Sequence, residues 1–129
     1  MTRPRYSNLD LTPTQVSLEL LKLGRKLAEA TKDLEQFEEE AVKLSDAYAT
    51  AMEQGVLRAN EEPSLTAGDT RKAWAFVRTQ PERIAARLAE AKVRARKQLI
   101  DTLKTRVTIG QSVATALRSE LDLEGLRSR

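Results

Sequence analysis

The chain has 129 residues, 32% of them charged and only 4% aromatic, with a formal net charge of +3. Its length fits one domain, and its composition is typical of long helices and coiled coils, which lack a thick core. Cysteine and histidine are both absent. Disulfides and thiol chemistry are therefore excluded, and the main zinc, copper and iron ligands and the most common general base are missing. We expect an all-α protein that is not an enzyme and holds no metal or cofactor.

Residues 1–11 are expected to form a flexible basic tail, and no apolar stretch follows their basic side chains. A signal peptide is therefore not predicted. No apolar run approaches the roughly 20 residues that a membrane span needs. The apolar positions also form narrow seams instead of a broad lipid-facing side. We expect a cytoplasmic protein without a membrane partner.

The first helix is predicted over residues 12–60. Thr12 can cap free backbone N–H groups, Pro13 suits the first turn, and Gln15 can complete a capping box. Apolar residues then recur in steps of four and three at Val16, Leu20, Leu23, Leu27, Ala30, Leu34, Phe37, Ala41, Leu44, Tyr48 and Ala51. An ideal helix would drift off such a stripe, so the pattern indicates a left-handed coiled coil with a partner helix. Gly24, less favourable than alanine by about 1 kcal/mol, is interpreted as a point of close helix approach.

Residues 61–69 contain Pro, Gly, Ser and Asn and are predicted to form a loop, with Thr66 or Asp69 capping the helix that follows. A second helix is predicted over residues 70–121. It is interrupted near Pro81, which lacks an N–H group and whose ring clashes with the preceding turn. We expect a short helix, a break or kink, a long helix to about Leu121, and a tail over residues 122–129. The predicted fold is one long antiparallel helical hairpin that forms a coiled coil.

The long second helix carries a less regular stripe, at Ile84, Leu88, Ala91, Ala95, Leu99, Leu103, Val107, Gly110, Ala114, Leu117 and Leu121. Its mean spacing is about 3.7, which predicts a stutter in the heptads. Other apolar residues lie off the stripes of the two helices, at Leu18, Leu21, Ile100, Ile109 and Val113. In a hairpin they meet at the end opposite the turn, and two helices cannot bury several apolar faces. We expect this end to hold a homo-oligomer together; the alternative is that the terminal tails cover it.

The charges are segregated along the chain. Residues 29–53 carry eight acids and two bases, whereas residues 71–106 carry eleven bases and three acids. In a hairpin turning near residue 66, positions whose numbers sum to roughly 132 face each other, and charges beside the seam can pair and set the register. We expect most of the basic helix to be neutralised in this way. Each exposed pair contributes only about 0 to 1 kcal/mol.

One basic cluster has no acidic partner in this register. Lys22, Arg25 and Lys26 lie opposite Lys104 and Arg106. Arg3 and Arg5 of the tail are expected nearby and would add to the cluster. Because like charges repel, such a cluster is suited to binding phosphate. The alternative interpretation is a solvated patch that only aids solubility.

A second candidate for binding nucleic acid is the segment that contains Arg71, Lys72, Trp74, Phe76 and Arg78. Aromatic rings among basic residues are what single-strand binders use to stack bases. However, Trp74 and Val77 are three residues apart and lie on one helix face, where they can pack against the turn of the hairpin or a neighbour. Packing is the favoured interpretation of Trp74.

The chain resembles small helical proteins that are common in the genomes of actinobacterial phages and prophages. The similar stretches are Asp46–Ala51, Ala91–Gln98 and Leu117–Leu121. More distantly, residues 12–121 are similar to the UvsY-type recombination mediators of T-even phages. Those proteins form rings and bind single-stranded DNA to help load a recombinase. The resemblance implies a homo-oligomer with single-stranded DNA and a recombinase or other protein as partners, and it assigns no individual DNA contact.

These observations favour a non-catalytic, homo-oligomeric phage protein that binds nucleic acid, above all single-stranded DNA, in recombination or replication. The rival hypothesis is a structural or adaptor coiled-coil protein. It would bind only protein partners, in virion assembly or on a host factor.

Overall fold

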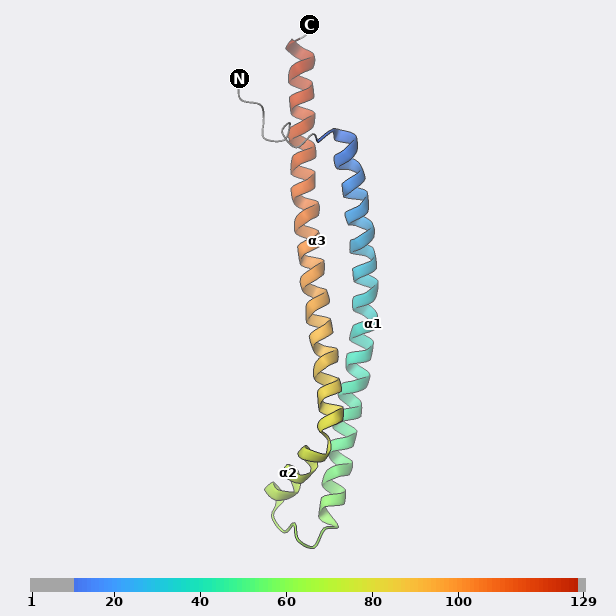
Figure 1. The fold of residues 1–129 in the computed structure, drawn as a ribbon, viewed down its shortest axis with the longest axis vertical. Coiled ribbons are helices and arrows are strands. Elements are labelled where there is room, and N and C mark those ends of the chain that lie inside the picture. The colour runs from blue at the N-terminus through green and yellow to red at the C-terminus, as the bar shows by residue number, and fades with distance from the viewer. Residues whose placement is uncertain (1–10, 128–129) are drawn as a thin grey trace. The chain divides into compact units, whose positions relative to one another are not determined.

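A computed structural model gives the structure of the protein and describes residues 11–127. Within this range the fold is all-α, with helices α1 (Pro13–Asn60), α2 (Gly68–Arg78) and α3 (Gln80–Arg127) and no strand (Figure 1). The chain forms two units. One joins α1 up to Thr31 with α3 from Gln98 onward, and the other is Lys32–Lys97.

The beginning of α1 is the predicted capping box. The backbone N–H of Thr12 donates to Gln15 Oε1 at 3.0 Å, and the N–H of Gln15 donates to Thr12 Oγ1 at 3.2 Å. These two bonds satisfy donors that a helix start otherwise leaves without an intrahelical partner. This prediction is confirmed.

The four-three stripe of α1 matches the burial of its side chains. Every residue of the stripe from Val16 to Ala51 is buried or half-buried, with Val16 and Ala30 the most buried. Large apolar residues between stripe positions, such as Leu18 and Val42, are exposed. The stripe is therefore the face of α1 that packs within each unit, which we call the α1 seam.

Helix α2 packs on the last turns of α1, inside the unit Lys32–Lys97 (Figure 1). Gly55 and Ala59 of α1 and Ala75 of α2 are all buried. A Cβ atom added to Gly55 would lie only 3.0 Å from Ala75 Cβ, so the helices meet here without room for a larger residue. The N-cap of α2 is Ala67, which makes no side-chain cap hydrogen bond; the prediction that Thr66 or Asp69 caps this helix is wrong.

The break between α2 and α3 falls at Thr79, beside Pro81, as predicted. The buried Thr79 hydroxyl donates to the carbonyl of Ala75 at 2.8 Å, and the Thr79 carbonyl accepts the N–H of Arg83 at 3.0 Å. One residue thus ends α2 and starts α3. The third helix continues to Arg127, so the prediction of a tail from residue 122 is wrong over the described residues.

The seam of α3 differs from the predicted stripe. It keeps steps of four and three, at Glu82, Ala86, Ala89, Val93, Arg96, Ile100, Leu103, Val107, Gly110, Ala114 and Leu117, all buried or half-buried. Ile84, Leu88 and Leu99, placed in the predicted stripe, are exposed, whereas Ile100, placed outside it, is only 8% exposed. The predicted stutter is therefore wrong, and the stripe is correct only from Leu103 to Leu117.

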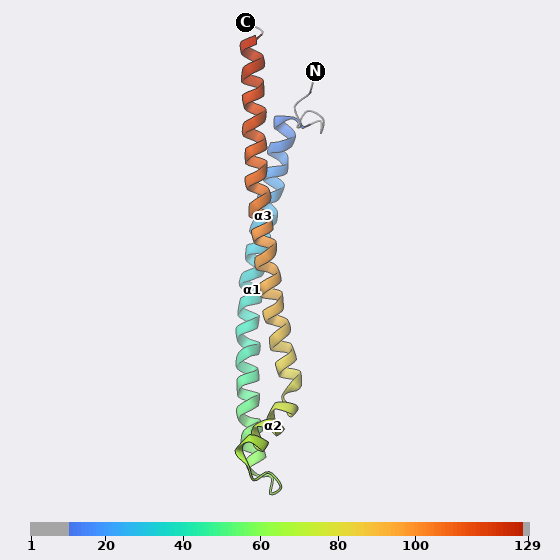
Figure 2. The same ribbon diagram turned by 90° about the vertical axis from the view of Figure 1, so that its left-hand side faces the viewer.

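In each unit taken by itself, α1 and α3 lie side by side and run in opposite directions (Figures 1 and 2). In the unit that ends at Arg127, Leu20 Cδ2 lies 2.7 Å from the position that a Cβ of Gly110 would take. In the unit Lys32–Lys97, Arg96 Nη1 lies 3.6 Å from Asp33 Oδ2. These contacts agree with the expected register, in which position numbers sum to roughly 132, to within about one helical turn.

The outer surface of α3 carries a series of hydroxyl groups between residues 102 and 119. They belong to Thr102, Thr105, Thr108, Ser112, Thr115 and Ser119. Each donates to the carbonyl four residues earlier, at 3.0 to 3.1 Å. All are exposed, so they bond back to their own helix and not to α1.

Replacing either of two glycines of α1 by alanine should change the free energy of unfolding, and the two changes should have opposite signs. Gly24 has open space around the position of an added Cβ, so the interpretation of Gly24 as a point of close approach is wrong. Gly24→Ala should stabilise the protein by about 1 kcal/mol through helix propensity. Gly55→Ala should destabilise it, because its Cβ meets Ala75. Urea unfolding followed by circular dichroism measures both; a loss of stability in Gly24→Ala would show that a neighbour occupies that surface.

Candidate nucleic-acid interface

The predicted basic cluster lies in the unit that ends at Arg127. Arg25, Lys26, Lys104 and Arg106 are exposed, and within the described residues none of them forms an ion pair. Lys22 instead lies 3.3 Å from Glu19, one turn earlier on α1. Lys22 is thus the least available of these cations for an external phosphate. Arg3 and Arg5, the remaining predicted members, lie outside the described residues.

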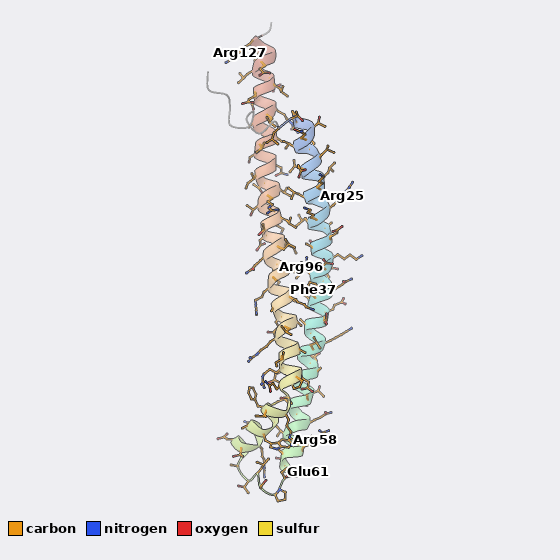
Figure 3. All side chains as sticks on the ribbon, in the orientation of Figure 1. Arg25, Phe37, Arg58, Glu61, Arg96 and Arg127 are labelled. Carbon is orange, nitrogen blue, oxygen red and sulfur yellow. The ribbon has the colours of Figure 1, made fainter. Side chains whose placement is uncertain are left out.

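The cluster is divided between the two edges of the helix pair. Leu20 packs on Gly110, so Lys26, six residues further along α1, is level with Lys104, six residues earlier on α3. Lys26 and Arg106 each precede a seam residue, which places both along one edge of an antiparallel pair. Lys104 follows a seam residue and lies at the other edge. Arg25 is on the side of α1 away from α3 (Figure 3).

Lys26 and Arg106 therefore form the compact part of the site. Two cations at facing edge positions repel each other, because such positions normally carry charges that pair across the seam. A phosphate between them would remove this repulsion and accept hydrogen bonds from both, since a guanidinium presents a planar set of donors and an ammonium three rotatable ones. We call Lys26 and Arg106 the cationic edge.

The predicted aromatic segment lies on α2 and is largely engaged within the chain. The Arg71 Nε–H donates to the carbonyl of Leu65 at 3.0 Å and ties α2 to the preceding loop. The Arg78 guanidinium lies over the ring of the half-buried Trp74, 4.2 Å from its centroid. Lys72 is exposed. Arg78 occupies one face of the Trp74 ring and the side chain is half-buried, which leaves less of the ring for a base to stack on, so α2 is a weaker candidate than the cationic edge.

A charged residue in the α3 seam was not foreseen. Arg96 lies 5.2 Å from the centroid of Phe37 and forms its ion pair with Asp33, and Figure 3 shows Arg96 and Phe37 at the same level. The aliphatic stem of arginine can cover apolar surface while the guanidinium reaches the edge. The only sequence signal was position: Arg96 continues the four-three spacing that ends at Leu117.

Internal neutralisation of the basic residues is slight. Across the helix pair of the unit Lys32–Lys97, the ion pairs are Arg96–Asp33 at 3.6 Å and Lys97–Glu38 at 4.0 Å. The side chain of Lys97 is 59% exposed, and such pairs contribute little. Arg87, Lys92 and Arg94 form no ion pair within the described part of the chain. The expectation that most of the basic helix is neutralised across the seam is wrong.

The predicted oligomer contacts fall into two groups. Leu18, Leu21 and Ile109 are exposed, so each has apolar surface that a partner could cover. Val113 is half-buried, and Ile100 is buried in the α3 seam. Ile100 therefore stabilises the unit itself and cannot contribute to a surface contact.

Residues 11–127 hold no group of three or more carboxylates placed to bind a metal ion. In the same range no helix has both the length and the apolar character that crossing a bilayer requires. Comparisons of the chain with protein-family models, with curated proteins and with solved structures gave no match. The geometry of the described residues therefore carries the functional argument.

Proposed function

We propose that the protein is a non-catalytic, homo-oligomeric nucleic-acid-binding protein of phage type that acts in the cytoplasm. It binds single-stranded DNA and by this binding supports recombination or replication. Its fold is a single antiparallel helical hairpin with coiled-coil packing. The matching four-three seams of α1 and α3 support the hairpin, because two such seams can interlock along their whole length.

The observation that carries the proposal is the cationic edge. Lys26 and Arg106 are exposed, carry the same charge and have no acidic partner among the described residues. Arg25 and Lys104 extend the positive charge on either side. The phosphate backbone supplies most of the affinity in binding that is independent of base sequence. A strand that follows the helix pair could thus bind without any base-specific contact.

The test is the salt dependence of binding to a fluorescently labelled single-stranded oligonucleotide, followed by anisotropy. Each phosphate contact on a single strand changes the slope of log Kobs against log salt by about −0.7. The double variant Lys26→Glu/Arg106→Glu should bind more weakly and lose about 1.4 from the magnitude of that slope. Absence of wild-type binding at about 50 mM salt, where phosphate contacts are strongest, would refute the proposal.

The control has the same change in net charge at two helix ends. Arg58 and Arg127 are exposed in the last turns of α1 and α3. Arg58→Glu/Arg127→Glu should leave the slope close to the wild-type value. An equal loss in both double variants would mean that the strand responds to net charge alone and that the cationic edge is no site.

An adaptor that binds only proteins is the second candidate, and it is favoured by the exposed apolar residues Ile84 and Leu88, both on α3 in the unit Lys32–Lys97. These residues repeat at near-helical spacing away from the seam, as expected of a face that receives a partner helix. This function predicts a protein indifferent to oligonucleotides at low salt. Substituting Leu88 by lysine would then abolish capture of the partner without affecting folding.

A further inference from the structure

A second apolar row runs along α1 beside the seam, inside the unit Lys32–Lys97. Val42, Ala49 and Met52 each follow a residue of the α1 seam by one position, Val56 follows the buried Gly55, and the polar Ser45 interrupts the row. We call this row the lateral face. Val42 is 61% exposed. A groove of about 420 Å³ is lined by the apolar Ala41, Val42 and Val93 together with the charged Glu38, Glu90, Arg94 and Lys97. Another groove, of about 680 Å³, is lined mainly by uncharged side chains, among them Ala49, Met52 and Val56, and by Glu53.

The lateral face has a line of acids along α1 on one side and, on the α3 side, an edge where the bases Arg87, Arg94 and Lys97 outnumber Glu90. Glu39, Asp46 and Glu53 are seven residues apart and exposed, so they form one line along α1. Arg87 and Arg94, also seven apart and exposed, form a line along α3, and Arg94 lines the smaller groove. None of these five forms an ion pair within the described residues. The border charges are thus free to meet a partner.

This arrangement of charges is complementary to itself. A two-fold axis parallel to the helices brings the acidic border of one copy onto the basic border of the other, and the reverse. An axis perpendicular to the helices would instead oppose acid to acid. The Asp33–Arg96 ion pair shows which residues of α1 and α3 lie at the same height along the helices. By this register, the heights of Glu39 and Arg94 differ by about one helical turn, and so do the heights of Asp46 and Arg87. Long side chains can span that offset.

We propose that a second copy of this chain docks on the lateral face, with the two-fold axis parallel to α1 and α3. Val42, Ala49 and Met52 of both copies then form a shared apolar layer, and Glu39 and Asp46 of each copy pair with Arg94 and Arg87 of the other. The outer row of α3 is a poorer site for a second copy, because Ile84 and Leu88 have bases beside them and no acidic border. The inference rests on the oligomeric part of the proposed function and is independent of nucleic acid.

The first measurement is the mass of the full chain in solution by sedimentation equilibrium, without nucleic acid. Val42→Lys should weaken association at least tenfold, while Leu88→Lys, an equally exposed apolar residue on α3 (60% against 61%), should leave it unchanged. Circular dichroism shows whether each variant keeps its helices. If the wild-type chain stays monomeric at about 100 µM, its association is much weaker than micromolar, and the inference is overturned. Loss of association in Leu88→Lys alone overturns it as well.

The second measurement exchanges the borders between two chains. Glu39→Arg/Asp46→Arg opposes base to base in its own dimer, and Arg87→Glu/Arg94→Glu opposes acid to acid, so each should associate at least tenfold more weakly. Mixed together they should form a heterodimer in which all facing charges are again opposite. If the wild-type chain associates but the mixture of the two variants does not, the lateral face is not the contact between the copies. Because the assay contains no DNA, that result leaves the cationic edge to be judged by anisotropy.

Discussion

Replacing Ile100 by alanine should lower the free energy of unfolding by about 2–5 kcal/mol, the range for removing a buried aliphatic side chain. Ile100 is 8% exposed, whereas the adjacent Leu99 is 39% exposed. Because Leu20 packs on Gly110, equal steps along the two antiparallel helices place Ile100 level with the buried Ala30. Leu99→Ala should change the free energy of unfolding by no more than about 1–2 kcal/mol, since more than a third of the Leu99 surface is in contact with water. The two variants remove similar apolar groups one residue apart.

Urea unfolding followed by circular dichroism at a single protein concentration measures this difference. A larger effect from Leu99→Ala would mean that α3 presents the other face to α1. That result would restore the stutter and refute the seam described above. Because both positions are in the unit that ends at Arg127, unfolding of α2 does not enter the comparison directly.

Replacing Ala75 by leucine should separate α2 from α1. Ala75 is fully buried and meets Gly55, which has no side chain that could move away. Overpacking of this kind is destabilising by about 1–3 kcal/mol. The expected result is a lower melting temperature together with increased exposure of Trp74, which α2 carries.

Trp74 is the only tryptophan of the sequence, so its fluorescence reports on α2 directly. Ala75→Leu should shift the emission to longer wavelength and increase quenching by acrylamide. Ala73→Leu is the matched control, because Ala73 is on the same helix and exposed. An unchanged spectrum in Ala75→Leu would indicate that α2 and α1 separate easily and that their contact is not tight.

The local signals of α1 and of the break near Pro81 could be predicted because each depends on a few neighbouring residues. A capping box needs only Thr12 and Gln15 at the correct spacing, and proline acts on the turn that precedes it. The α1 seam was also predictable, since its apolar residues continue without interruption from Val16 to Ala51. These features do not depend on which partner helix is chosen.

The α3 seam could not be predicted from hydrophobicity alone. Ile84, Leu88 and Leu99 are more apolar than Ala86, Ala89 and Arg96, yet the second set lies in the seam. The reason is the partner: α1 repeats strictly in fours and threes, and a stuttered helix would lose register with it. Small alanines also allow close approach to α1. Requiring α3 to have the same four-three repeat as α1 would have identified the correct seam residues of α3.

The sequence predicted correctly which residues of the candidate site lie at the same height along the two helices. It did not predict on which edge of the helix pair each residue lies. Lys26, Lys104 and Arg106 do lie at similar heights, as the register requires. Whether two of them are neighbours depends on whether each precedes or follows a seam residue, and the wrong α3 stripe hid this distinction. The corrected seam leaves Lys26 and Arg106 together and separates Lys104.

Because of the hydroxyl series, the last part of α3 depends on its packing against α1 to stay helical. Threonine and serine have low intrinsic helix propensity, and a side chain bonded to its own backbone adds nothing to the attachment between helices. Residues 102–119 would therefore be a poor helix in isolation, held straight mainly by the apolar side chains opposite. Separation of α1 from this stretch should therefore lower its helix content.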